Sequence, residues 1–318
     1  MTDNNDIGEK ETELYDRQLR LWGFEAQKRM QQSRILFCGV TGLQIEAAKN
    51  LVLAGVSVVL QDNTVLRADD LSALYFASQS DIGTNRAVAV QKKLQALNSY
   101  VTVDIEVKAI EDIPDDYLTA FSVIVATDIS EIQALRLDSL CRSADLSFIH
   151  CGSYGEQGWF ALDLAPSFTF QHDPPRNTKV ETLVYPSLED IWAVKWADLK
   201  KKHFPVSDVF VRSRILSAFR EAHGRLPCES DFATVQALTQ SLLVKNNLPE
   251  DFLSSEDIER NLCRSSYSQL MPVCSIVGGF LSQEIVKAVS RVGVPMHNVF
   301  VYSLADSVGR AFSTSNAA

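Results

Sequence analysis

The residues best suited to chemistry form a glycine loop at 39–44, with the sequence GVTGLQ. In loops of this kind, glycines let backbone N–H groups and a helix N-terminus approach a phosphate. Gly39 and Gly42 take the first and fourth positions, but Thr41 and Gln44 stand where further glycines would clear the way. Because a Cβ at Thr41 would obstruct a closely approaching phosphate, the loop taken alone favours a structural turn over a tight nucleotide site.

The segments around this loop predict a Rossmann-like unit. Residues 34–38 form a nearly continuous apolar run, as expected of a central strand buried on both faces. A helix at 44–54 and a strand at 56–62 follow, and the strand ends in Asp62. Strand, glycine turn, helix, strand and acid is the order of a dinucleotide-binding unit, in which the acid binds ribose. An NAD-dependent oxidoreductase is therefore one alternative, which the blocked glycine pattern disfavours.

The pattern of apolar segments continues as a doubly wound, mostly parallel α/β sheet. A strand at 157–164 extends it, in antiparallel direction, and strands at 299–302 and 308–312 close it. Between Glu11 and Gln32 we expect two helices separated by a break at Gly23. The remaining predicted elements are helices at 83–98 and 131–142 and strands at 101–107, 121–127 and 146–151.

From about Pro166 the chain changes character, and we predict a helical insertion without strands. The long apolar helix that follows, 272–292, contains Gly278–Gly279, a pair that permits the close approach of another backbone. The predicted divisions are an N-terminal helical segment at 1–33, a Rossmann-like domain at 34–165, the helical insertion at 166–265, and a return to the first domain at 266–318.

Composition limits the classes of partner. The chain has 318 residues, 46% of them apolar, and a net charge of -10, which argues against nonspecific binding to nucleic acid or an anionic membrane. No CxxC pair occurs among the six cysteines, so a zinc site of the usual spacing is not expected. Because residues 1–6 are polar and acidic, we expect reduced thiols in a nuclear or cytosolic compartment. No apolar run is expected to span a membrane.

The motifs YDRQLRLWG at 15–23, DIGTNRA at 81–87, LNSYV at 97–101 and MPVCSIVGGFLSQEIVKA at 271–288 stand out in the sequence. Together they resemble one family, the activating enzymes of ubiquitin-like modifiers. In that family an active and an inactive half pair as two related domains of the ThiF/MoeB-like adenylation fold. The active half binds ATP and Mg²⁺ and adenylates the modifier's C-terminal glycine, after which a cysteine in another domain takes the modifier as a thioester. The four motifs of this chain are most similar to the inactive half.

The resemblance implies that the catalytic groups of the active half are missing here. Ala73 and Leu74 stand where its nucleotide-facing Arg and Gln belong, and neither can stabilise phosphate charge. Arg86 replaces the catalytic lysine, and Asp128 is retained from the metal-binding Asp–Asn pair while Ile129 replaces its neighbour. We therefore expect no cofactor or metal to be held tightly by this chain, a degenerate site at the positions named, and ATP with Mg²⁺ in a partner subunit.

Arg17 is the one catalytic candidate that the resemblance supplies. In this family the arginine of the motif at 15–18 reaches from the inactive half to the ATP of the partner, as an arginine finger acting in trans. A guanidinium suits this role because it is always charged and can contact two phosphate oxygens at once. The alternative is a surface arginine in a local salt bridge with Asp16 or Glu13, which would contribute little.

Chain length and two segments, 184–190 and 297–300, are most similar to the branch of the family that activates SUMO-type modifiers. The implied partners are a larger subunit with the catalytic cysteine and the SUMO-type modifier, in the nucleus and also the cytoplasm. Cys141, Cys151 and Cys228 do not resemble the catalytic-cysteine segment and are expected to be dispensable. Two alternatives within the fold are the inactive subunit for another modifier and a bacterial-type homodimer with its own ATP site.

Overall fold

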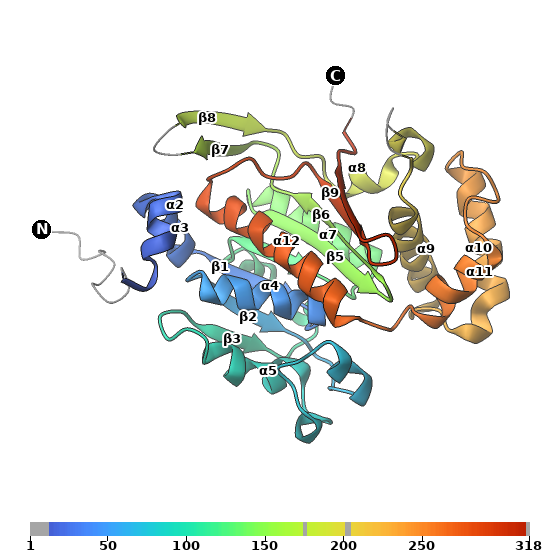
Figure 1. The fold of residues 1–318 in the computed structure, drawn as a ribbon, viewed down its shortest axis with the longest axis horizontal. Coiled ribbons are helices and arrows are strands. Elements are labelled where there is room, and N and C mark those ends of the chain that lie inside the picture. Colours follow the sequence, from blue (N-terminus) through green and yellow to red (C-terminus); the bar gives the residue numbers. More distant parts are fainter. Residues whose placement is uncertain (1–12, 174–176, 201–204, 316–318) are drawn as a thin grey trace, which may run out of the picture.

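The computed structural model describes residues 13–173, 177–200 and 205–315. Its centre is an eight-stranded sheet with the order β10-β9-β6-β5-β4-β1-β2-β3, crossed by helices on both faces (Figure 1). Five neighbouring strands are parallel and three join through antiparallel pairs. The mostly parallel sheet and the antiparallel direction of the strand at 157–164 are as predicted. The parallel strands are β1 (Arg34–Cys38), β2 (Ser57–Gln61), β3 (Val103–Glu106), β4 (Val123–Ala126) and β5 (Ser147–Tyr154); the antiparallel ones are β6 (Gln157–Asp163), β9 (Val299–Ser303) and β10 (Val308–Phe312).

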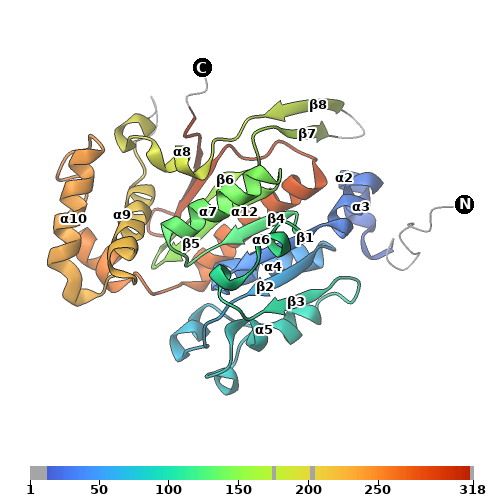
Figure 2. The ribbon, with the colours of Figure 1, turned by 180° about the vertical axis from the view of Figure 1, so that it is seen from behind.

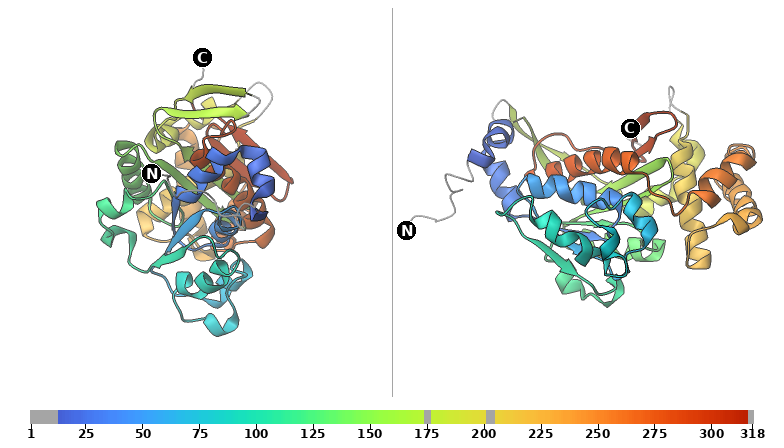
Figure 3. Two further views of the ribbon diagram at one scale, coloured as in Figure 1. Left: turned by 90° about the vertical axis from the view of Figure 1, so that its left-hand side faces the viewer. Right: turned by 60° about the horizontal axis from the view of Figure 1, so that its bottom comes forward.

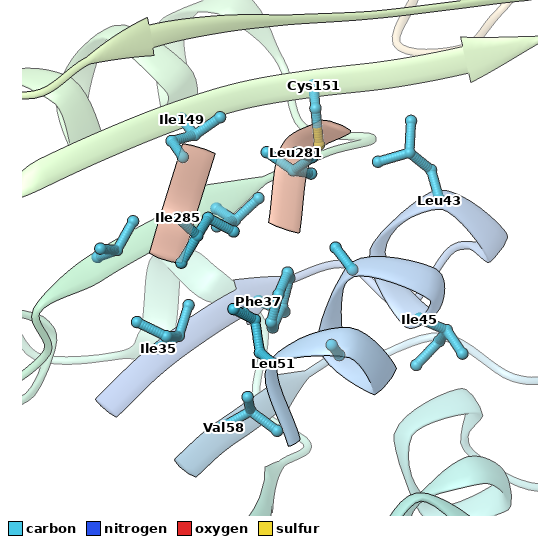
Figure 4. Packing of buried hydrophobic residues seen from close by; sticks show 14 of the residues in the cluster. Ile35, Phe37, Leu43, Ile45, Leu51, Val58, Ile149, Cys151, Leu281 and Ile285 are labelled. Atoms are coloured by element: carbon cyan, nitrogen blue, oxygen red, sulfur yellow. The ribbon is translucent and has the colours of Figure 1, made fainter. Parts of the chain in front are cut away.

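Two layers of helices bury the faces of this sheet. One layer contains α4 (Gly42–Leu53), α5 (Arg86–Gln95) and α12 (Met271–Ser290). Figure 2 shows the other face, which α6 (Asp115–Leu118) and α7 (Glu131–Ser143) cover. Apolar side chains of β1, α4 and α12 interlock in the first layer (Figure 4). The remaining short helices of this part are η1 (Ala68–Ser72), η2 (Gln79–Asp81) and η3 (Ile110–Asp112).

The long helix α12 lies beside α4 (Figures 1 and 3). At Gly278 an added Cβ would lie 2.7 Å from the carbonyl oxygen of Leu43 on α4, whereas at Gly279 it would meet nothing within 4 Å. The predicted close approach is therefore confirmed for Gly278 and wrong for Gly279. By length and composition α12 would also suit a membrane span, contrary to the sequence-based expectation, but 67% of its apolar window is buried, as in a core helix.

The predicted helical insertion does not begin with a helix. It begins with a two-stranded hairpin, β7 (Phe168–Asp173) and β8 (Asn177–Leu183). Phe168 and Phe170 are buried and alternate with polar residues, the period-two pattern of a strand. The adjoining sequence HDPPRN at 172–177, which is typical of a loop, obscured this pattern. Helices follow as predicted: α8 (Leu188–Ala193), η4 (Trp196–Leu199), α9 (Asp208–His223), η5 (Glu229–Asp231), α10 (Phe232–Lys245), α11 (Ser255–Asp257) and η6 (Ile258–Arg264).

Two short helices, α2 (Asp16–Trp22) and α3 (Phe24–Gln32), precede the sheet and meet at Gly23 as predicted. They lie beyond the end of α12, at the amino ends of the parallel strands (Figure 1). Arg29 on α3 donates a hydrogen bond to the carbonyl oxygen of Ser290, the last residue of α12, at 2.8 Å. This pair of helices therefore lies at the amino ends of the parallel strands, whereas the glycine loop lies at their carboxyl ends.

A buried pair of carboxyl groups connects the sheet to the insertion. Asp138 on α7 and Asp163 on β6 are each 2% exposed, and Arg142 donates to Asp163 at 2.6 Å. Asp138 accepts the N–H of Leu188 on α8 through one oxygen, while its other oxygen has no donor unless the pair of acids holds a proton. Burial, followed by repulsion from Asp163, raises the pKa of Asp138 to about 8.

This raised pKa predicts a loss of stability with rising pH. Unfolded Asp138 ionises near pH 4, whereas the folded chain keeps the proton until about pH 8. The free energy of unfolding should therefore fall between these values, by at most about 1.4 kcal/mol per pH unit. An asparagine at position 138 can accept the N–H of Leu188 and donate to Asp163, and it has no proton to lose. Asp138→Asn should therefore make the free energy of unfolding less dependent on pH, and the variant should be more stable than wild type at pH 8. Urea unfolding of wild type and variant at pH 5 and pH 8 measures how the free energy of unfolding of each changes with pH. An equal change in the two proteins would contradict the raised pKa of Asp138.

Candidate functional site

The residues of the predicted degenerate site gather where β1, β2 and β4 end. They line two adjoining hollows of about 440 and 220 Å³, which share Arg86 and Asp128. Thr41, Ala73 and Leu74 line the larger hollow, and Gly39 and Asp62 line the smaller one. The ends of neighbouring parallel strands are where ligands bind in folds of this kind. The fold thus places the predicted residues together, and their hydrogen-bond partners decide what they can do there.

At the ribose-binding position, the carboxylate of Asp62 is already used by the chain itself. One oxygen accepts the N–H of Val40 in the glycine loop at 2.7 Å, and the other accepts the N–H of Thr64 at 2.7 Å together with the Thr64 hydroxyl. The side chain is 3% exposed. Asp62 therefore holds the glycine loop against the next strand, and few lone pairs are left for a ribose.

In the glycine loop, the backbone N–H at the start of α4 also has a partner within the chain. The N–H of Gly42, at the start of α4, donates to the side-chain oxygen of Gln269 at 2.9 Å. The methyl group of Ala73 packs directly against Gly42, because an added Cβ there would lie 2.6 Å away. Thr41, the expected obstruction, is buried and caps α4 by accepting from Gln44. Sequence reasoning missed Gln269, which is 227 residues from the loop and follows no local pattern.

Arg86, at the position expected to correspond to the catalytic lysine, is paired with a carboxylate of its own chain. Arg86 donates two hydrogen bonds to Asp70, at 3.0 Å and 2.6 Å, in the forked geometry typical of strong arginine–carboxylate pairs. Burial opposes the charged guanidinium, but Asp70, supported by Asp62 and Asp128, outweighs it and raises the pKa of Arg86. The positive charge at this position is thus balanced by a carboxylate of the same chain.

Asp128, the acid at the position expected to bind a metal ion, is also paired with an arginine of the same chain. Arg220, on α9 of the insertion, donates to Asp128 at 3.1 Å and to the carbonyl oxygen of Ile129 at 3.2 Å. Arg220 is 92 residues from Asp128, and no motif in the sequence indicated it. Within residues 13–173, 177–200 and 205–315, no group of three or more metal-binding side chains is assembled.

Arg17 lies outside this cleft. Helix α2 carries it near the amino ends of the parallel strands, whereas the cleft lies at their carboxyl ends (Figure 1). Its side chain is exposed, and among the described residues it makes no hydrogen bond or ion pair. Asp16, the expected local partner, pairs instead with Arg20 at 3.0 Å. Arg17 therefore lies too far round the sheet to contact the cleft of its own chain, and its exposed guanidinium is unpaired among the described residues.

The six cysteines are free thiols, and only Cys228 is exposed. Burial raises the pKa of Cys151 to about 12 and that of Cys141 further. A thiol reacts as its thiolate, so these two buried groups are poor nucleophiles. Cys228 donates its S–H to the carboxylate of Asp231 at 3.1 Å.

Comparison with known proteins decides the family. The model of the ThiF family matches residues 15–317, which is nearly the whole chain. The chain belongs to the ThiF family. Among the relatives of this ThiF-family chain, SUMO-activating enzyme subunit 1 of Dictyostelium discoideum is 31% identical over 313 residues, covering 95% of this chain and 94% of the relative. The proteins of the same name from Danio rerio and Homo sapiens are 32% and 30% identical over 93% of this chain, with 92% and 93% of the relatives covered.

Solved structures agree on the fold. PaaA superposes with a TM-score of 0.56 at 14% identity, over 99% of this chain and 78% of that chain. The Escherichia coli protein MccB, solved with MccA-N7isoASN, has a TM-score of 0.57 at 13% identity, over 95% and 72%. At these identities the likeness concerns the fold alone, and it confirms the predicted ThiF/MoeB-like architecture.

Proposed function

We propose that this ThiF-family chain is the non-catalytic subunit of a heterodimeric, ATP-dependent SUMO-activating enzyme. It would support the adenylation of the modifier's C-terminal glycine and the formation of the thioester on a larger partner subunit. The proposal is supported by relatives named SUMO-activating enzyme subunit 1, at about 30% identity over 93% or more of the chain. The number in that name implies a further subunit, and the proposed site of action is the nucleus and the cytoplasm.

The observation that carries the proposal is the internal pairing of the cleft. ATP and Mg²⁺ need free backbone donors, a free cation and a free carboxylate in such a site. Here each of these groups already has a hydrogen-bond partner in the same chain. The backbone N–H of Gly42 donates to Gln269, Arg86 donates to Asp70, and Asp128 accepts from Arg220. The residues present do not fit the nucleotide or its metal ion. We therefore assign ATP and Mg²⁺ to the partner subunit, and none to this chain.

Arg17 is the group that this chain would contribute to the reaction. It is exposed and unpaired among the described residues. Its helix lies at the amino ends of the parallel strands, away from the cleft at their carboxyl ends. A free guanidinium on an outer helix can reach a phosphate only on another molecule. This supports the role of Arg17 in trans, where it would stabilise the negative charge that develops on the partner's ATP during transfer.

The purified chain alone is expected to catalyse no exchange between ATP and pyrophosphate, because its cleft lacks free groups for either. Exchange should appear when the larger subunit and the modifier are added, and titration of the chain alone with NADH should give no binding. Radiolabelled pyrophosphate incorporation into ATP measures the first result and fluorescence titration the second. Exchange by the chain alone would favour the bacterial-type homodimer, and NADH binding would favour the oxidoreductase.

Co-purification tests the assignment to the SUMO pathway. The full-length chain, tagged and expressed in cells, is expected to retain a larger ThiF-family subunit that carries a catalytic-cysteine domain. The reconstituted pair should then form a thioester with SUMO and not with ubiquitin or other ubiquitin-like modifiers. Recovery of the chain without such a subunit would overturn the proposal, while a thioester with another modifier alone would assign the chain to another branch of the family.

A further inference from the structure

The helix that carries Arg17 is only partly anchored: Trp22, at its end, packs against the core from a partly buried position. None of the side chains of α2 is fully buried. Tyr15, the residue directly before the helix, is 1% exposed, and its side chain is one of the largest that are fully buried. Because Arg17 follows only two residues later, the direction of its side chain depends on how firmly Tyr15 is seated.

The seat of Tyr15 is built from segments distant in sequence. Asn98, which follows α5, donates one hydrogen bond to the Tyr15 hydroxyl and another to the carbonyl oxygen of Val52, both at 2.8 Å. The ring lies against Gly55, where an added Cβ would be 2.9 Å from the phenol carbon and oxygen. Asn98 is itself buried. The phenol is thus fixed by the loop after α4 and the loop after α5 together.

We propose that Tyr15 and Asn98 are positioning residues that aim Arg17 at the active site of the partner subunit. This inference rests on the proposed function, in which Arg17 acts in trans. Both side chains are buried within this chain, so both act only through α2. The role is chemically demanding because misplacing a catalytic group by about 1 Å can cost about 100-fold in rate.

A role in packing alone makes a different prediction from a positioning role. If Tyr15 only stabilises the fold, its removal lowers the amount of folded subunit and does so equally whether residue 17 is arginine or alanine. If Tyr15 acts through Arg17, its removal has no further effect on catalysis once the guanidinium is gone. A double-mutant cycle between the two residues separates these cases.

The experiment uses the assembled heterodimer and measures ATP–pyrophosphate exchange. Tyr15→Ala is expected to lower kcat by at least about 10-fold with KM for ATP changed by less than about twofold, and the double variant with Arg17→Ala should stay within about twofold of Arg17→Ala alone. Tyr185→Ala is the matched control, because Tyr185 is also 1% exposed and its hydroxyl donates to a backbone oxygen, that of Met296. It should lower stability without changing kcat per folded heterodimer.

Asn98→Ala and Tyr15→Phe keep the test decisive if Tyr15→Ala does not fold. Both remove the hydroxyl–amide contact and keep most of the packing. Both should lower kcat when Arg17 is present and leave kcat unchanged when they are combined with Arg17→Ala. Independent, multiplicative losses with and without the guanidinium would overturn the positioning role. If Arg17→Ala itself leaves exchange unchanged, the role of Arg17 in trans fails, and that result is distinct from a failure of the cycle.

Discussion

Arg17→Ala is expected to slow adenylate formation by the assembled heterodimer by about 10- to 100-fold, since a hydrogen bond to a charged group contributes about 1.5–3 kcal/mol. The physical reason is the loss of a cation from a site where negative charge develops on phosphate. Assembly and thermal stability should not change, because the side chain is exposed and makes no ion pair among the described residues. Pyrophosphate exchange at saturating ATP measures the effect.

The chain offers a matched control on the same helix. Arg20 is also an exposed arginine of α2, but it pairs with Asp16 of its own helix. Arg20→Ala should therefore leave the exchange rate within about twofold, as expected for a surface ion pair of small energy. Arg17→Lys keeps the charge without the forked donors and should fall between wild type and alanine. An exchange rate for Arg17→Ala equal to that of wild type would refute the proposed role.

Gly278→Ala is expected to destabilise the fold by about 2 kcal/mol, as overpacking of a close contact does. The added Cβ would lie 2.7 Å from the carbonyl oxygen of Leu43 and 2.7 Å from the Cβ of Glu46. One of these is backbone, so α12 and α4 must move apart. Since both helices cover β1, the movement would loosen the layer shown in Figure 4. Chemical unfolding of the isolated chain measures the change.

The next residue supplies the comparison. Gly279→Ala adds the same methyl group to the same helix, but nothing lies within 4 Å of it. Alanine is a better helix former than glycine by about 1 kcal/mol, so this variant should be as stable as wild type or more stable. The two substitutions thus should shift the unfolding midpoint in opposite directions. Equal shifts would mean that the contact between α12 and α4 is looser than these distances indicate.

The central sheet could be predicted from the sequence because its strands are short, apolar and separated by clear turns. Residues 34–38 are a strand in both the prediction and the structure, and the antiparallel strand β6 was also expected. The hairpin β7–β8 was missed because its alternating Phe168 and Phe170 adjoin the sequence HDPPRN at 172–177, which is typical of a loop. Strand patterns of this length compete with loop signals, and tertiary packing against Tyr185 and Arg291 decides between them.

The candidate site could be predicted only in part. The positions of Ala73, Arg86 and Asp128 follow from the family resemblance, because each aligns with a residue of the active half's motifs. Their partners do not. Gln269 and Arg220 come from segments 227 and 92 residues away, and a hydrogen bond of a single side chain leaves no periodic pattern in a sequence. The sequence thus indicated which catalytic groups to expect absent, and the structure added the hydrogen-bond partners of the residues that stand there.

The hydrogen bond between Gln269 and the N–H of Gly42 should limit how many nucleotides the assembled enzyme can hold. A nucleotide entering this cleft would have to displace the glutamine and separate two arginine–carboxylate pairs before making any contact of its own. The proposed heterodimer contains two related domains, yet only one of them would then take up ATP. Equilibrium dialysis of the assembled enzyme should accordingly saturate at one nucleotide per pair of subunits, and no cooperativity between two ATP sites should be detectable.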